Sequence, residues 1–333
     1  MDIGIDIGGT NMKVGLVDAR GRVAARRRLA TKASEGPGPA LERLGRCIAG
    51  LRKGKRVKSI GVGIAGLVDH ARGVVRIPPN LPGWDGTKVQ EVLKHMTGLP
   101  VHCANDANAV TLGEWLYGAG RGCRNLFCLT LGSGVGGGAI VNNKLFLGAN
   151  HAAGELGHTV IFGNGLVCRC GGRGCVERYA GADYIVRRAR QRVKAAIKRA
   201  RDHRNQIPMF KGIMDKKPGM LVEKFATRLS RLTMKDIGRA ARAKDRLALK
   251  LVEETGYYLG LGLVNVVALY DPERIVIGGG VSGLGRPLMR AVRKTVFSRI
   301  QFFPGRRLEI VFGRLGNDAG IIGATRLGKH MPA

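Results

Sequence analysis

The sequence has no long hydrophobic run. None of its apolar stretches approaches the roughly 18 consecutive residues that a membrane-spanning helix needs. The N-terminus, MDIGIDIGGT, also lacks the basic region and the apolar stretch of a signal peptide. We therefore expect a cytoplasmic protein with no membrane partner.

The sequence also lacks an even number of cysteines. Of the seven cysteines, Cys168, Cys170 and Cys175 fall within eight residues, and the other four are scattered in apolar surroundings. This pattern argues against a disulfide framework. In a reducing compartment a tight cluster is typical of metal binding, and isolated cysteines are typical of small core residues.

Acidic residues are scarce. There are 24 Asp and Glu against 56 Lys and Arg, which gives a formal charge of +32 and a field that attracts polyanions. The stretch from Arg187 to Lys250 holds 21 basic and 5 acidic residues and so carries half of the excess. Nucleic acid, a phosphate-rich substrate and a merely solvated basic surface all fit this charge. We favour the last, because basic residues are spread over other segments as well.

At 333 residues with 44% hydrophobic content, the chain is long enough for two domains that each bury a core. Alternation and turn residues predict a strand–turn–strand hairpin over 3–17 and a second one over 126–141, which suggests an internal duplication. A Rossmann or Walker loop would need a helix after the first strand. Periodicity predicts an α/β protein, with helices over 39–52, 87–96, up to 117, 183–204, 247–270 and 318–327, and strands over 59–65, near 101 and over 274–277.

Three glycine-rich turns punctuate these elements. The first, Asp6-Ile-Gly-Gly-Thr10-Asn-Met-Lys13, combines glycines with a hydroxyl and a cation, so backbone N–H groups and side chains can approach phosphate oxygens. The turn LGSGVGGG over 131–138 offers a second cradle, and 278–283 offers a third turn, where a base or ribose could lie. A single turn of this kind is equally an ordinary hairpin, but three in this order favour nucleotide binding.

The spacing His158-x9-Cys168-x-Cys170-x4-Cys175 supplies four ligands for a metal. One histidine and three cysteines form a closed tetrahedral set for zinc, with no open position for water. We therefore expect structural Zn²⁺ that orders a glycine-rich loop, to which metal binding can contribute ~10 kcal/mol or more. The alternative is a group of core cysteines beside a stray histidine, but packing rarely produces Cys-x-Cys spacing.

The order DIGGT, NDAN, LGSGVGGG, GELGH, CRCGGRGCVE and IGGGVSG resembles the ROK family (repressors, open reading frames and kinases) over roughly residues 2 to 327. This resemblance implies a two-domain actin-like ATPase (ribonuclease H-like) fold, with nucleotide and sugar meeting in the interdomain cleft. We expect a small N-terminal α/β domain of residues 1–108 plus 318–333. Residues 109–317 would form a large α/β domain carrying the zinc loop and a basic helical insertion around 199–221.

The resemblance also implies roles for individual residues. Asp106 matches the catalytic base, although a helix N-cap is the alternative for an Asp in this position. His158 would bind zinc through one ring nitrogen and a sugar hydroxyl through the other, and the apolar and glycine neighbours of Glu155 predict partial burial. The sugar pocket would draw on Asn80, Asn105, Glu155, His158 and Glu177, and the nucleotide would contact Gly8, Gly9, Thr10, Lys13, Gly132, Ser133, Gly134, Gly279 and Gly280.

Within the family, the segments Pro79–Trp84 and Asn105–Asn108 look most like those of bacterial ATP-dependent glucokinases. That likeness implies transfer of phosphate from ATP, with Mg²⁺, to glucose, in a homodimer or homotetramer. Polyphosphate as donor and a broader range of hexoses or N-acetylhexosamines are alternatives, although polyphosphate-specific relatives tend to lack the cysteine motif. Family repressors carry a helix-turn-helix ahead of the kinase-like core, whereas here the first phosphate motif opens the sequence, so we do not expect nucleic acid as a partner.

Overall fold

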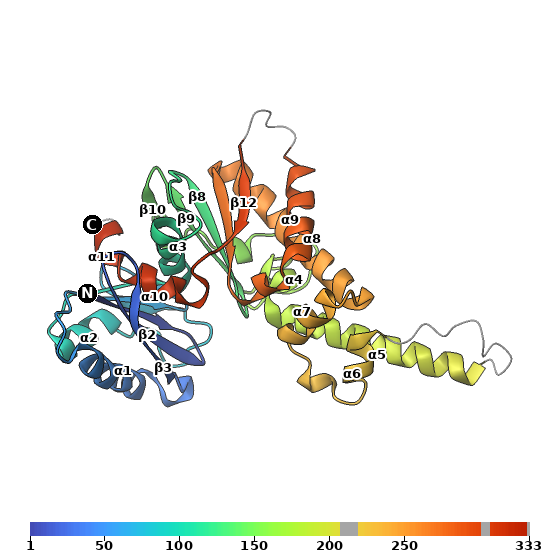
Figure 1. Cartoon of the computed structure of the whole chain (residues 1–333), viewed down its shortest axis with the longest axis horizontal. Coiled ribbons are helices and arrows are strands. Elements are labelled where there is room, and N and C mark those ends of the chain that lie inside the picture. The colour runs from blue at the N-terminus through green and yellow to red at the C-terminus, as the bar shows by residue number, and fades with distance from the viewer. Residues whose placement is uncertain (207–218, 301–306, 332–333) are drawn as a thin grey trace.

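The protein contains two five-stranded sheets with the same strand order (Figure 1). The computed structural model describes residues 1–206, 219–300 and 307–331. In each sheet three strands form an antiparallel meander, and two further strands run parallel to the first strand of that meander. The shared topology confirms the expected duplication. The first sheet comprises β3 (Val23–Ala30), β2 (Asn11–Val17), β1 (Asp2–Ile7), β4 (Ile60–Ile64) and β7 (Val101–Asn105), and the second comprises β10 (Lys144–Phe146), β9 (Val135–Val141), β8 (Leu126–Leu131), β11 (Arg274–Gly278) and β12 (Glu309–Phe312).

Helices cover both sheets, and the expected ones are present, although the helix expected over 318–327 ends at residue 324 and the helix at 286–297 was not expected. The long helix expected over 247–270 is α8, and the helix expected to end at residue 117 is α3. The described helices are α1 (Pro37–Arg52), α2 (Val89–Thr97), α3 (Asp106–Tyr117), α4 (Glu177–Ala180), α5 (Ala182–Gln206), α6 (Met220–Phe225), α7 (Met234–Arg242), α8 (Arg246–Tyr270), α9 (Arg286–Phe297), α10 (Ala319–Ala324) and α11 (Leu327–His330); a small hairpin is formed by β5 (Leu67–Asp69) and β6 (Val74–Arg76). None of the described helices is both long and apolar enough to cross a bilayer.

Glycines in the first sheet allow α10 to lie directly on its strands. The isoleucines of β1 are fully buried, and Gly4 faces the other way. A Cβ atom on Gly4 would stand 1.8 Å from the carbonyl oxygen of Ile321, and one on Gly61 would stand 1.7 Å from that of Ala324. The alternation of glycine with isoleucine and valine in β1 and β4 therefore provides a flat face on which the C-terminal helix packs.

The helices α3 and α10 lie between the two sheets and contact each other closely (Figure 1). A Cβ atom on Gly323 of α10 would lie 1.7 Å from the carbonyl oxygen of Ala109 in α3. The buried carboxylate of Glu114, also in α3, accepts hydrogen bonds from the N–H groups of Ala119 (2.8 Å), Arg314 (3.0 Å) and Leu315 (2.9 Å). The segment that returns the chain from the second sheet to the first is thus fixed to α3.

The two largest clusters of buried side chains each join one sheet to its helices. One cluster joins the first sheet to α1 and α2 and includes the fully buried Trp84, and the largest joins the second sheet to α5, α7, α8 and α9. Packing of α10 on β1 and β4 agrees with grouping the C-terminus with the first domain, while the boundaries at 108/109 and 317/318 stay a prediction.

The sequence analysis found the outer strand β7 but missed the other outer strands of the two sheets, β3, β10 and β12. The strand β3 carries Arg26, Arg27 and Arg28, all exposed, and β10 and β12 are three and four residues long. Charged or very short edge strands lack the apolar alternation that marks a strand in a sequence, and they also discourage pairing with another chain. Edge position therefore explains both the composition of these strands and their absence from the prediction.

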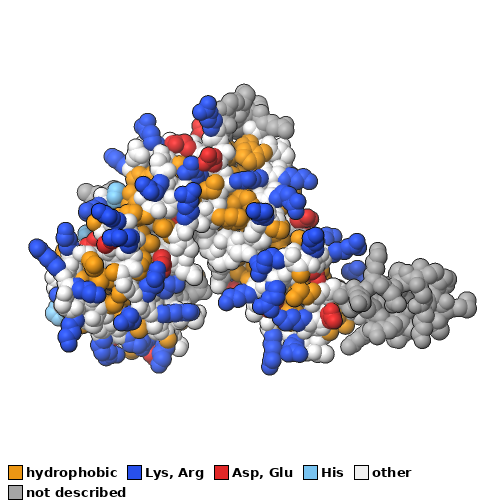
Figure 2. All heavy atoms as spheres, in the orientation of Figure 1, with side chains coloured by type: hydrophobic (Ala, Val, Ile, Leu, Met, Phe, Trp, Pro, Cys, Tyr) orange, Lys and Arg blue, Asp and Glu red, His pale blue; other side chains and the backbone are white. Residues whose placement is uncertain are grey.

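Basic side chains are spread over the surface. Figure 2 shows Lys and Arg distributed across the whole visible face, and a hollow between the lobe of the first sheet and the lobe that carries α7. This distribution favours a basic solvated surface. Figure 1 shows α5 projecting from the body of the protein, as the predicted basic helix, while residues 207–218 of the predicted insertion lie outside the described residues.

Candidate functional site

The second and third glycine turns lie against each other. Gly279 has a φ of 86°, and a Cβ atom there would stand 2.3 Å from the carbonyl oxygen of Leu131. Gly280 is exposed and faces open space. Because no side chain could occupy position 279, this glycine allows the turn at 278–283 to meet the turn at 131–134, as joint nucleotide binding requires.

The first glycine turn carries two unused backbone donors. The N–H group of Gly8 donates to the carbonyl of Asn11 at 3.0 Å and closes the turn. The N–H groups of Gly9 and Thr10 have no acceptor among the described residues. Successive free N–H groups in a turn form an anion-binding concavity. A Cβ atom on Gly9 would stand 2.6 Å from the carbonyl oxygen of Asn80, so this glycine also admits the loop that carries the exposed Asn80.

The second turn has a similar form. The N–H group of Gly132 donates to the carbonyl of Gly134 at 3.0 Å, and the N–H of the exposed Ser133 between them has no acceptor in the described chain. On the other side of this turn lies the carboxylate of Glu177, whose Oε2 accepts a hydrogen bond from the N–H group of Val135 at 3.0 Å. A Cβ atom on Gly134 would lie 2.2 Å from that same oxygen. Glu177 is thereby fixed beside the second turn by one carboxylate oxygen.

Lys13 is paired with Asp6. These residues are cross-strand neighbours in β1 and β2, and Lys13 Nζ lies 2.8 Å from Asp6 Oδ2. The lysine side chain remains 40% exposed, so its other ammonium protons are available to a phosphate. The sequence analysis did not assign Asp6 a role of its own. Its position at the end of β1, next to a parallel strand, could have indicated one.

Asp106 is the first residue of α3 and directly follows β7. The helix cap is Asn105, whose Oδ1 accepts the N–H groups of Ala107 (2.8 Å) and Asn108 (3.3 Å), and whose Nδ2 donates to the carbonyl of Gly66 (2.9 Å). The alternative reading of Asp106 as the N-cap is therefore wrong. Capping by Asn105 leaves the Asp106 carboxylate with one backbone contact, to the N–H of Ala107 at 2.9 Å.

Asp106 is surrounded by acidic groups. Burial raises the pKa of its carboxyl to about 6, the carboxylates of Asp6 and Glu155 raise it further, and the N–H of Ala107 opposes them. A carboxylate with a pKa near 6 is ionised at neutral pH but basic enough to accept a proton in a transition state. In a chain with so few acidic residues, this gathering of carboxylates is a distinctive feature.

Glu155 is exposed as a whole residue, but protein atoms crowd its carboxyl, so the predicted partial burial holds for that group only. Loss of hydration among the surrounding atoms raises the pKa of its carboxyl, His158 lowers it and Glu177 raises it. A solvent-open carboxylate that is crowded by protein atoms is typical of the wall of a concave surface. Glu155, His158 and Glu177 are thus electrostatic neighbours, as the expected sugar pocket requires.

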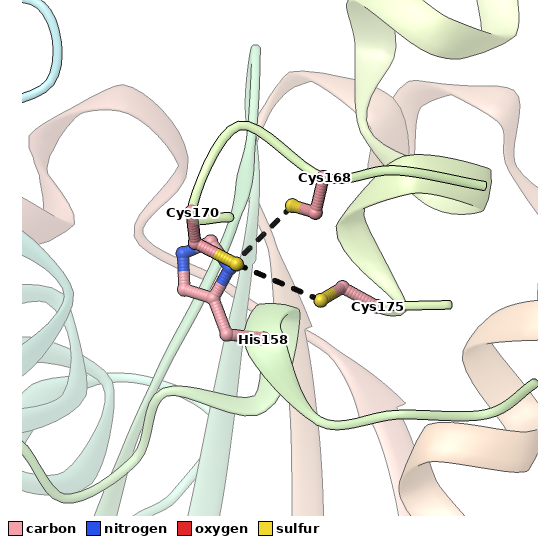
Figure 3. A group of neighbouring side chains, drawn as sticks. All are labelled: His158, Cys168, Cys170 and Cys175. Carbon is pink, nitrogen blue, oxygen red and sulfur yellow. Dashed lines mark hydrogen bonds between the residues drawn. The ribbon is translucent and has the colours of Figure 1, made fainter. Parts of the chain in front are cut away.

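The ligand atoms of His158, Cys168, Cys170 and Cys175 all lie within 4.8 Å of one another (Figure 3). Cys168 Sγ lies 3.8 Å from His158 Nδ1, and Cys170 Sγ lies 3.7 Å from Cys175 Sγ. Tetrahedral zinc with Zn–S bonds of about 2.3 Å sets its sulfur ligands roughly 3.8 Å apart. The four side chains therefore fit zinc. Since Nδ1 faces the sulfurs, Nε2 is the nitrogen that remains for another partner.

The segment that carries these cysteines has little core of its own. Leu166 and Val167 are half exposed, and the segment is held by the Tyr179 hydroxyl, which accepts the N–H of Leu166 at 2.9 Å. Arg178 donates to the carbonyl of Val167 at 2.6 Å while its guanidinium stacks on Tyr184, 4.2 Å from the ring centre. Such a loop gains much of its order from any metal that its ligands hold.

Known proteins resemble this chain over nearly its whole length. Residues 2–331 match the ROK family. The chain is 33% identical to a glucokinase of Streptomyces coelicolor over 99% of its own length and 98% of the relative, and 34% identical to a glucokinase of Thermotoga maritima over 98% and 97%. It is also 26% identical to a putative xylose repressor of Caldicellulosiruptor, covering 77% of that protein.

Solved structures show the same fold. A ROK family glucokinase from Streptomyces griseus, in complex with glucose and AMPPNP, superposes with a TM-score of 0.82 at 33% identity and covers 98% of both chains. A ROK hexokinase from Thermus thermophilus superposes with a TM-score of 0.75 at 28% identity, over 98% of this chain and 97% of the other. The expected two-domain, actin-like α/β fold is thereby confirmed, and the chain belongs to the ROK family, with the fold of its sugar kinases.

Proposed function

We propose that this protein transfers the γ-phosphoryl group of ATP to the 6-hydroxyl of D-glucose, giving ADP and glucose 6-phosphate. The observation that carries the proposal is Asp106, a half-buried carboxylate with its pKa raised to about 6, beside turns with free backbone N–H groups. The Streptomyces griseus relative, which holds glucose and AMPPNP, supports the same pair of substrates. We place the site in the hollow between the lobes in Figure 2.

Phosphoryl transfer needs positioning, neutralisation of phosphate charge and one acceptor for the proton of the attacking hydroxyl. Asp106 accepts that proton in this proposal. Free N–H groups in the turns, with Lys13, contact the phosphates, and Mg²⁺ bound with ATP would neutralise part of their charge. Gly279 and Gly280 lie close to the adenosine. Phosphate contacts are assigned to Gly9, Thr10, Lys13, Ser133 and Gly134, while the N–H groups of Gly8 and Gly132 close the two turns.

Glucose is bound through side chains that both accept and donate hydrogen bonds, because each sugar hydroxyl does both. Glu155 and Glu177 offer carboxylate oxygens, and His158 offers Nε2 while Nδ1 faces the cysteine sulfurs. Asn105 caps the helix with Oδ1 and donates one amide proton to the carbonyl of Gly66. Its other amide proton is free to bind a sugar hydroxyl. Asn80 lies in the loop that packs closely against Gly9.

Zinc is assigned a structural role at His158, Cys168, Cys170 and Cys175. The donor set is closed, and the sulfur spacing fits a tetrahedral ion. Through His158 the metal would hold the wall of the sugar pocket. We further propose a cytoplasmic enzyme that forms a homodimer or homotetramer, as expected from the sequence.

Relatives include a glucomannokinase from Arthrobacter that uses inorganic polyphosphate or ATP, at 26% identity and a TM-score of 0.60, so the donor needs a direct test. A coupled assay should cross ATP and polyphosphate against glucose, mannose, fructose, N-acetylglucosamine and N-acetylmannosamine. We expect the highest kcat/KM for glucose with ATP. A preference for polyphosphate or for an N-acetylated sugar would replace the proposal, and turnover of no sugar would favour a repressor-like or other binding role.

The pH profile of the reaction should report the Asp106 carboxyl. Because the base must be ionised and its pKa is raised to about 6, kcat/KM should be flat above pH 7 and fall about tenfold per pH unit below 6. Glu155→Gln removes a neighbouring negative charge, so it should move the midpoint to lower pH even if the plateau is reduced. A wild-type profile that stays flat down to pH 5 would reject Asp106 as the titrating base.

A further inference from the structure

A buried hydroxyl lies behind the first glycine turn. Thr31, which follows β3, is fully buried, and its Oγ1 donates to the carbonyl oxygen of Gly8 at 2.6 Å. Its backbone N–H donates to the carbonyl oxygen of Thr10 at 3.0 Å. One residue outside the motif therefore binds two of the three carbonyls of the segment Gly8–Thr10.

These bonds determine where the free N–H groups of the turn point. The carbonyl of Gly8 and the N–H of Gly9 belong to one planar peptide unit and point in opposite directions. Thr31 holds the carbonyl from the buried side, so the N–H of Gly9 is directed away from the core. That N–H has no acceptor in the described part of the chain, as a phosphate-binding donor requires. The glycines themselves restrict the backbone little, so the orientation has to come from a neighbour.

The contacts of Thr31 continue into α1, and Thr31 with Arg43 is called the clamp below. Arg43 Nη2 donates to the carbonyl of Thr31 at 2.6 Å, and Arg43 Nη1 donates to Glu35 at 2.9 Å. All the polar groups of Thr31 are thereby engaged: the hydroxyl and N–H with the turn, and the carbonyl with Arg43. The helix α1 thus holds Thr31, and Thr31 holds the turn.

We propose that Thr31, held by Arg43, is a positioning residue that orients the Gly8–Thr10 turn for the phosphates of the nucleotide. The inference rests on the proposed function, because it assigns nucleotide phosphate to this turn. Preorganised donors bind an anion without first having to be ordered, so loss of the clamp weakens nucleotide binding while the sugar pocket stays intact.

The test is Thr31→Val, which keeps the size of the side chain and removes its donor. We expect the dissociation constant of ADP, measured by calorimetry, and the KM for ATP to rise about tenfold, the effect of one well-placed hydrogen bond. The KM for glucose should change less than twofold. Thr31→Ser restores the hydroxyl and should stay within about threefold of the wild type. Arg43→Gln should also raise the dissociation constant of ADP.

Thr325→Val is the matched control, because Thr325 is also buried and its hydroxyl donates to the carbonyl of Ile322 at 2.6 Å, away from the turn. It should leave ADP binding unchanged. Equal ADP affinity in Thr31→Val and the wild type would overturn the clamp alone. Equal weakening in Thr31→Ser and Thr31→Val, or in the control, would also overturn it, since general destabilisation would then explain the loss. Wild-type protein that binds neither ATP nor ADP would overturn the proposed function together with the clamp.

Discussion

Asp106→Asn should lower kcat for glucose phosphorylation by about three orders of magnitude, within the range that a general base contributes. Asparagine keeps the shape of the side chain and the contact with the N–H of Ala107, but it cannot accept a proton at neutral pH. The dissociation constant of glucose, measured by calorimetry, should change little. Single-turnover kinetics would place the loss in the chemical step.

The same variant should be more stable than the wild type. The folded-state pKa of Asp106 is raised to about 6 from 3.8, so the ionised carboxylate costs folding free energy above pH 6, and the cost disappears as the pH falls below 4. Asp106→Asn should thus gain up to about 3 kcal/mol at pH 7.5 and nothing at pH 3.5. Asp18→Asn, which removes a carboxylate from an outer turn of the same sheet, is the control for activity. Turnover of the Asp106→Asn variant within tenfold of the wild type would reject Asp106 as the base.

Cys175→Ser should release the metal and weaken sugar binding in one step. We expect wild-type protein to hold one zinc per chain and the variant to hold almost none. The glycine-rich loop would then lose its main source of order, so Tm should fall by about 10 °C. His158 would no longer be fixed, and the KM for glucose should rise at least about tenfold if one buried polar contact is lost. Metal content, calorimetry and steady-state kinetics measure the three effects.

Cys47→Ser is the matched control, because Cys47 lies in α1, outside the group of four ligands. It should keep zinc, Tm and glucose affinity close to those of the wild type. The affinity for ADP should be unchanged in both variants, since the turns that hold the phosphates carry none of these cysteines. A Cys175→Ser variant without zinc but with normal glucose affinity would show that the metal does not support the sugar pocket.

Much of the fold could be predicted because local signals and tertiary packing agree. The hairpin of β1 and β2 follows from an apolar run that meets two glycines, and α8 follows from a helical apolar pattern over its whole length. The outer strands β3, β10 and β12 could not be found this way. The exposed arginines of β3 carry no alternation, because neighbouring strands rather than its own side chains hold an edge strand in place.

Sequence spacing predicted the metal cluster, because its ligands lie close together in the chain. Contacts between distant segments could not be predicted. The bond from Glu177 to Val135 joins residues 42 apart, and Thr31 reaches Gly8 across 23 residues. Burial depends on the same distant packing, which is why Glu155 is exposed as a residue while its carboxyl is crowded by protein atoms. The cap at Asn105 was a local signal that was given to the wrong residue, since Asp and Asn cap helices equally well.

The most direct test of the proposed reaction is the structure of its product. Purified protein incubated with ATP, Mg²⁺ and glucose labelled with ¹³C at carbon 6 should yield ADP and phosphosugar in equal amounts, and the NMR signal of carbon 6 should be split by coupling to phosphorus. Formation of ADP without phosphosugar, or a phosphate attached to any other carbon, would contradict the assignment of this site to phosphoryl transfer onto the 6-hydroxyl of glucose.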